Sequence, residues 1–118
     1  MIDPALIPAV AARFKVLGVP ARLAILSALR SEEKSVGDLV AAIGRSQPNV
    51  SQHLAALTQA RFVAMRREGN RVFYREADPC LAQICEAVCE SLAGRMREEQ
   101  KLMRTLAGRR RVAARVRR

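Results

Sequence analysis

At 118 residues, of which 50% are hydrophobic, the chain has the length of one compact domain. Its formal charge of +10 suits a polyanion, and three phenylalanines and one tyrosine give few stacking platforms for single strands, so duplex DNA leads over RNA and anionic membranes. An acid near the N-terminus, no long apolar run and an odd number of clustered cysteines argue against a signal peptide, a membrane span and a disulfide framework. We therefore expect a cytoplasmic protein with no membrane partner.

The first third of the chain predicts two helices. A helix-start signal at Asp3-Pro4 and a glycine at position 18 bound the first, and Pro20 opens the second. Their apolar positions recur at helical spacing: Val10, Phe14 and Leu17 form the predicted buried stripe of the first, and Ile25, Leu26 and Leu29 the stripe of the second.

Two short helices joined by a glycine turn follow. Ser35 and Asp38 have the spacing of a capping box, and the helix that they start ends at Gly44. Ser46 caps the next helix, whose predicted buried stripe is Val50, Leu54 and Leu57. Such a pair is typical of a helix-turn-helix.

After this helix the spacing of apolar residues changes from the helical period to that of strands. Strand-forming residues on both sides of Glu68-Gly69-Asn70 predict a hairpin. Asp78-Pro79 repeats the cap-plus-proline signal and starts a long amphipathic helix to about Leu106, with this apolar stripe: Leu81, Ile84, Cys85, Val88, Leu92 and Met96. The expected fold is mainly α with a β-hairpin wing, a winged helix-turn-helix.

The charge is unevenly distributed along the chain. Residues 108–118 hold six arginines and no acid, which leaves +4 for residues 1–107. We expect residues 1–107 to form the DNA-binding and dimerisation domain and residues 108–118 to be an Arg-rich, disordered tail.

The helix over residues 46–59 turns a neutral, amide-rich face outward. Amides pair with adenine edges in the major groove, and small side chains allow close approach to thymine methyls. Alone, this patch fits a solvated helix face equally well, but the arginines around the hairpin tip suit phosphate contacts and favour DNA. The predicted DNA-binding residues are Gln47, Asn49, Ser51, Gln52, His53, Arg66, Arg67 and Arg71.

His53 has two open roles, a phosphate contact or a boundary histidine bonded to a neighbouring backbone group. It is the single histidine of the chain and is far in sequence from the cysteines, so a metal site there is disfavoured.

No glycine-rich phosphate loop and no nucleophile beside a histidine pair are present, so we expect no enzyme.

All three cysteines, Cys80, Cys85 and Cys89, lie in one ten-residue stretch of the last predicted helix. Cys85 and Cys89 are i, i+4 on one face, with Cβ atoms about 6 Å apart, whereas Cys80 lies about 140° from Cys85 around the helix. Cys80 joins them only if the first turn is distorted or a partner subunit supplies it. Packing as small hydrophobes is the alternative role for these residues.

The order of these elements, with residues 17–26, Ser46 to Leu57 and the Arg-Arg-Glu-Gly hairpin, resembles the ArsR/SmtB family of bacterial repressors over residues 12–95. The resemblance implies a dimer, paired through its terminal helices, that leaves a double-stranded DNA operator when an inducer, usually a metal ion or metalloid, binds. No constitutive cofactor is implied.

The chain departs from the family pattern at several positions. Val19 replaces an aspartate cap, Arg61 replaces a glycine at the end of the recognition helix, and Ser35 to Val40 lacks the arsenic-type cysteines. In the family's last-helix zinc set, Asp78 and Cys80 would match, but Ser91 and Gly94 stand at the other two positions.

The remaining thiols favour a soft inducer, As(III) or Sb(III), or Cd, Pb or Hg, bound by Cys80, Cys85 and Cys89. Two alternatives stay open. The cysteines could instead form a redox or persulfide switch in the same repressor, or the chain could be a constitutive, nonspecific architectural DNA binder.

Overall fold

The computed structural model describes residues 1–117, and Arg118, the last residue of the predicted tail, lies outside them. The chain divides into two compact units, residues 1–79 and a unit that begins at Cys80. The first unit contains a 3-10 turn (Pro4–Leu6), four helices, α1 (Ile7–Leu17), α2 (Pro20–Ala28), α3 (Val36–Ile43) and α4 (Gln47–Gln59), and three strands, β1 (Lys34–Ser35), β2 (Val63–Glu68) and β3 (Arg71–Glu76). The second unit is α5 (Cys80–Val116).

The core of the first unit lies among α2, α3, α4 and the start of β2. It is built from side chains that are at most 5% exposed: Ile25, Leu26, Leu29, Leu39, Val50, Leu54, Leu57, Phe62 and Val63. The predicted stripes of the second and fourth helices are therefore confirmed. Phe14 was predicted to be buried but is 53% exposed, whereas Leu17 of the same predicted stripe is 6% exposed.

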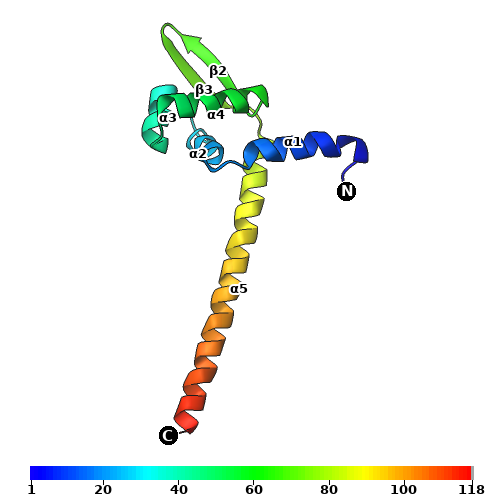
Figure 1. Ribbon diagram of the computed structural model, residues 1–118, viewed down its shortest axis with the longest axis vertical. Helices are drawn as coiled ribbons and strands as arrows, with labels where there is room; N and C mark the ends of the chain where they lie inside the picture. Colours follow the sequence, from blue (N-terminus) through cyan, green and yellow to red (C-terminus); the bar gives the residue numbers. More distant parts are fainter. Residues whose placement is uncertain (118) are drawn as a thin grey trace. The chain divides into compact units, whose positions relative to one another are not determined.

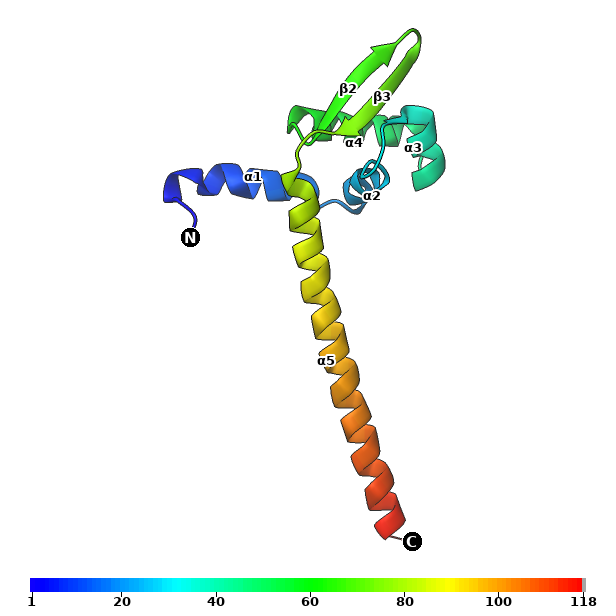
Figure 2. The ribbon, with the colours of Figure 1, turned by 180° about the vertical axis from the view of Figure 1, so that it is seen from behind.

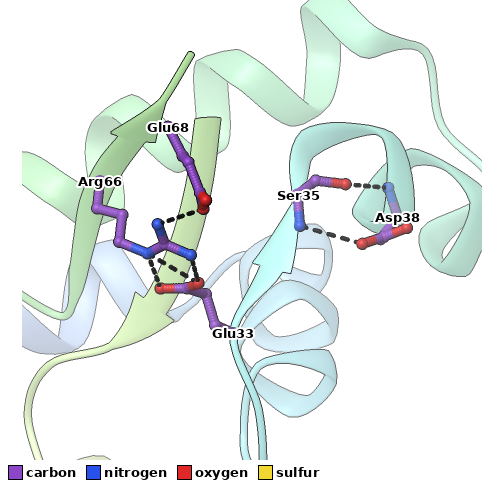
Figure 3. A network of polar contacts seen from close by, with 5 residues as sticks. All are labelled: Glu33, Ser35, Asp38, Arg66 and Glu68. Atoms are coloured by element: carbon purple, nitrogen blue, oxygen red, sulfur yellow. Dashed lines mark hydrogen bonds and ion pairs between the residues drawn. The ribbon is translucent and has the colours of Figure 1, made fainter. Parts of the chain in front are cut away.

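The capping box that starts α3 is present as predicted. The backbone N–H of Asp38 donates to the Ser35 hydroxyl, and the Ser35 N–H donates to the Asp38 carboxylate, each at 3.2 Å (Figure 3). These hydrogen bonds also lower the pKa of Asp38. α3 ends at Gly44, which has a φ of 73° and lets the chain turn sharply into α4.

The wing is a hairpin of β2 and β3 in a three-stranded sheet of order β1-β3-β2. Glu68 and Arg71 close a two-residue turn in which Gly69 has a φ of 60°, a conformation that glycine adopts without a steric cost. Figure 1 shows the hairpin extending away from α2, α3 and α4. The predicted hairpin is confirmed, and β1 adds a third strand that the sequence did not predict.

The corner between α4 and β2 is a Schellman-type helix end with arginine at the position that glycine usually holds. Arg61 has a φ of 63°, and its N–H donates to the Thr58 carbonyl at 3.0 Å. The N–H of Phe62 donates to the Leu57 carbonyl at 3.0 Å, and both side chains are buried. The turn thus fixes the direction in which the wing leaves α4.

Arg13 of α1 stabilises this corner from outside. Its guanidinium donates to the Ala60 carbonyl at 3.1 Å and pairs with Asp78 at 2.7 Å. The same group lies 4.1 Å from the centre of the Phe62 ring. α1 therefore contributes to the position of the wing.

α5 is one uninterrupted helix, coloured from yellow to red in Figure 2. It continues to Val116, ten residues beyond the predicted end at Leu106, where the sequence predicted a disordered tail. Its last third is rich in Arg and Ala, which are strong helix formers, and contains one glycine, Gly108. Among the described residues, no helix is long and apolar enough to span a bilayer.

Candidate nucleic-acid interface

α4 is positioned by its cap and by its buried stripe. The Ser46 hydroxyl accepts a hydrogen bond from the Asn49 N–H at 3.3 Å, and Pro48 lies in the first turn, where its missing N–H has no intrahelical acceptor. Val50, Leu54 and Leu57 are fully buried. Because this stripe is fixed in the core, the opposite face of α4 faces outward.

Three of the predicted DNA-reading residues are exposed near the start of α4. Gln47, Ser51 and Gln52 are all exposed in the first two turns of α4. Helices that read the major groove contact base edges mainly with residues near their N-terminal end. The arrangement therefore presents one hydroxyl and two amides in the part of the helix that reads bases in proteins of this kind.

Asn49 differs from its neighbours. It is half-buried, and its Oδ1 is buried without a hydrogen-bond partner among the described residues. On the helical wheel Asn49 and Ser51 stand about 100° from Val50 on its two sides, so the helical period alone does not distinguish the half-buried Asn49 from the exposed Ser51. An unpaired buried acceptor of this kind costs about 1–3 kcal/mol, so a group that reaches Asn49 would recover part of that free energy.

His53 is a boundary residue whose partner is a side chain. Arg22 of α2 donates from Nε to Nδ1 of His53 at 3.2 Å and from Nη1 to the Val16 carbonyl at 3.1 Å. Burial, and then the positive charges of Arg22 and Arg45, lower the pKa of His53 from 6.5. The imidazole is therefore neutral at pH 7, with Nδ1 as an acceptor and a hydrogen on Nε2 that can donate.

Arg66 in the wing is held by two carboxylates (Figure 3). Its Nε donates to both oxygens of Glu33 at 2.9 Å, and Nη1 pairs with Glu68 at 2.8 Å. The guanidinium also lies 4.6 Å from the centre of the Phe73 ring. This pairing raises the pKa of Arg66 and lowers that of Glu33, so both groups stay charged.

The remaining predicted arginines of the wing lie on two faces of the hairpin. Arg71 is exposed, on the same face as Arg66, and its guanidinium is 5.1 Å from the centre of the Phe73 ring. Arg67 points to the other face, is exposed and forms no ion pair with any residue that the structure describes. Arg67 and Arg71 are thus exposed arginines of the wing that no carboxylate of the described residues pairs with.

The sequence did not reveal three residues that shape this surface, Arg22, Glu33 and Arg13. Glu33 precedes the unpredicted strand β1, and its partner lies 33 residues away in the wing. Arg22 and Arg13 contact residues that are 31 and 47 positions away. Such pairs form only when the chain folds, so a local sequence pattern does not reveal them.

The cysteines lie on α5. Cys80 and Cys89 are exposed and Cys85 is half-buried. Because α5 is helical throughout, Cys85 and Cys89 are one turn apart on one side of it, while Cys80 lies on another side. Within the described part of the chain no three His, Cys, Asp or Glu residues are grouped so as to hold a metal ion. One chain thus offers a pair of sulfur ligands rather than a complete set.

Comparison with known proteins places residues 19–64 in a family described as "Bacterial regulatory protein, arsR family". The HTH-type transcriptional regulator Rv0081 of Mycobacterium tuberculosis is 40% identical over 81 residues, which are 68% of this chain and 71% of that protein. The biofilm growth-associated repressor of Agrobacterium fabrum is 42% identical over 79 residues, 67% of this chain and 68% of that protein. A "Probable mercury resistance operon repressor" of Streptomyces lividans is 35% identical over 71 residues, 60% of this chain and 57% of that protein.

Solved structures have the same fold. The crystal structure of M. tuberculosis Rv0081 superposes with a TM-score of 0.73 at 35% identity, covering 83% of this chain and 98% of that one. The homodimeric winged helix-turn-helix DNA-binding domain Mb0332 of Mycobacterium bovis, solved by NMR, gives a TM-score of 0.65 at 34% identity, covering 76% of this chain and 82% of that one. The winged helix-turn-helix predicted from the sequence is confirmed.

Proposed function

The chain belongs to the ArsR family of bacterial regulatory proteins, and from this we propose that it is a homodimeric repressor released from duplex DNA by a thiophilic metal or metalloid. Its relatives are DNA-binding transcriptional regulators, several of them repressors. The proposal adds the residues that read DNA, the oligomeric state and the class of inducer.

The observation that carries the DNA-binding role is the outward amide face of α4 beside the arginine wing. Gln52 can pair bidentately with adenine, and Ser51 can donate to or accept from a base edge. Arg67 and Arg71 then contact phosphates, which fix the register but carry no sequence information. His53 contributes through Nε2–H, because its Nδ1 already accepts from Arg22.

Exposed apolar surface supports the dimer. In α1, Ile7 and Phe14 are 50% and 53% exposed, and in α5, Val88, Leu92 and Met96 are 54% to 61% exposed. Exposed apolar patches on a small protein are typical of a site of association. A homodimer would carry two copies of α4, and half-sites in adjacent major grooves of DNA lie about 34 Å apart.

The cysteine pair supports the class of inducer. Cys85 and Cys89 place two thiolates about 6 Å apart by Cβ atoms, a span that one large, soft centre can bridge. Cys80, from the same chain or from the second copy, is the third ligand in the proposal. As(III) or Sb(III) is the preferred inducer, with Cd, Pb or Hg as the soft divalent alternative.

The test compares operator binding by the wild type and by Cys85→Ser/Cys89→Ser, with and without arsenite, antimonite or a soft divalent ion. The ions should release the wild type, and the double variant should stay bound. Cys80→Ser alone shows whether the third thiol is needed. If the double variant binds DNA like the wild type in the absence of inducer, it is correctly folded. If inducer then releases it like the wild type, Cys85 and Cys89 are not the inducer site.

The exposure of Cys80 and Cys89 gives the redox or persulfide alternative a physical basis, because accessible thiols can be oxidised. The same assay separates the two when peroxide or polysulfide is added with a chelator and metals are added without one. Release by peroxide or polysulfide but not by metals would replace the metal-based proposal with a thiol switch.

A further inference from the structure

The C-terminal half of α5 carries an excess of positive charge. After Glu99 the chain has eight lysines and arginines and no acid. The side chains from Arg95 to Arg117 are all exposed, and none of these arginines forms an ion pair with a residue that the structure describes. Like charges one turn apart destabilise a helix, so this segment gains free energy from an external polyanion.

Because the segment is helical, each charged residue has a defined position around the helix axis. Arg97, Arg104, Arg111 and Arg115 fall within an arc of about 40°, at about 100° per residue. We call these four residues the basic stripe. They extend over 18 positions, which is about 27 Å of helix.

The basic stripe lies away from the apolar face of the same helix. Leu92, Met103 and Leu106 are centred roughly 130° around the helix from it, and they are 57%, 66% and 45% exposed. If a second copy covers the apolar face, as the proposed dimer requires, the basic stripe still faces solvent.

We propose that the basic stripe is a second DNA-binding surface, which contacts the phosphate backbone of duplex DNA without reading its sequence. Arginines in a line can follow a line of phosphates, and each contact releases condensed counterions. The choice of duplex DNA as the polyanion rests on the proposed function, in which the first unit binds DNA.

An anionic membrane is the competing partner, since helices that lie on membranes also have a basic and an apolar face. Two features of the chain disfavour it. Glu99 falls within the apolar face of α5, and the chain has no tryptophan to anchor at the lipid interface. The membrane is therefore an outcome that the experiment must be able to detect.

The experiment measures binding of full-length protein to a random duplex of about 40 base pairs over a series of salt concentrations. The stripe variant is Arg97→Gln/Arg104→Gln/Arg111→Gln/Arg115→Gln. The matched control, Arg95→Gln/Arg109→Gln/Arg110→Gln/Arg117→Gln, removes the same charge from other faces of the helix. Glutamine has nearly the helix propensity of arginine, and circular dichroism and sedimentation verify the helix and the oligomeric state of both variants.

The stripe variant should lose about 0.9 in the salt slope for each phosphate contact removed, hence about 2 to 4 in all, and the control less than about 1. Over a fourfold range of salt this loss changes relative affinity by about 16-fold or more. Arginine-to-lysine changes at the four stripe positions should keep the slope. Equal losses in stripe and control variants, or no loss in either, would overturn the proposal.

Two further arms separate the remaining outcomes. Vesicles of phosphatidylglycerol and phosphatidylcholine should bind both variants alike, and stripe-dependent vesicle binding without a stripe effect on DNA would assign the surface to membranes. The ratio of operator to random affinity should be the same in the stripe variant and the wild type. A wild type without operator preference would contradict the proposed function, while the salt slopes on random DNA would still decide this inference.

Discussion

Replacing Arg61 by glycine should stabilise the protein, because Arg61 holds a left-handed backbone conformation with a φ of 63°. That conformation costs a residue with a Cβ about 1–2 kcal/mol. Glycine removes this cost but adds about 0.5–1 kcal/mol of chain entropy to the unfolded state. The expected net gain is about 0.5–1 kcal/mol of unfolding free energy.

The assay is urea unfolding at one fixed protein concentration, since the stability of a dimer depends on concentration. With a slope of about 1–3 kcal/mol/M, the midpoint of Arg61→Gly should rise by a few tenths of a molar. Arg61→Ala is the matched control, because it removes the charge but keeps the Cβ. If the glycine variant is no more stable than the alanine variant, the helix end between α4 and β2 is not strained and the reasoning fails.

Further predictions concern the DNA surface and its pH dependence. Gln52→Ala should cost about 1–3 kcal/mol of operator discrimination and leave binding to random duplex unchanged, as measured by fluorescence anisotropy; equal losses on both duplexes would make Gln52 a backbone contact. Glu33→Gln should release Arg66 from its carboxylate and make the salt dependence of DNA binding steeper, whereas an unchanged slope would place Arg66 away from DNA. His53 has a lowered pKa, so the unfolded state takes up its proton first, and stability should fall as the pH drops below about 6.5. Urea unfolding should show a smaller fall for His53→Gln, and an equal fall would mean that the neutral imidazole beside Arg22 is not the cause.

Local signals were enough to predict most of the first unit. Caps, glycines and apolar spacing identified α2, α3, α4 and the hairpin, and the capping box of Ser35 and Asp38 has the predicted partners. β1 was missed because two residues are too few to show a strand period, and its pairing with β3 is made far along the sequence. The end of α5 was predicted too early, because a run of like charges indicated disorder although its residues are good helix formers.

The candidate site was predicted less completely than the fold. The outward positions of Ser51 and Gln52 follow from the helical period, whereas Gln47, about 60° from Val50 around the helix, is exposed at the first position of α4. The ion pairing of Arg66 cannot be predicted in this way, because its partner Glu33 comes near only in the folded chain. The roles of the DNA-reading residues and of the cysteines remain predictions.

Selection of bound sequences from a pool of random duplexes tests the central claim, that exposed residues of α4 and the wing read DNA, most directly. The account predicts enrichment of a two-fold symmetric sequence with half-sites about one helical turn apart, and loss of that enrichment in Gln52→Ala. It also predicts that the enriched duplex binds about 10³-fold or more tightly than unselected DNA. A pool that remains random after repeated rounds, with equal affinities before and after, would contradict the account.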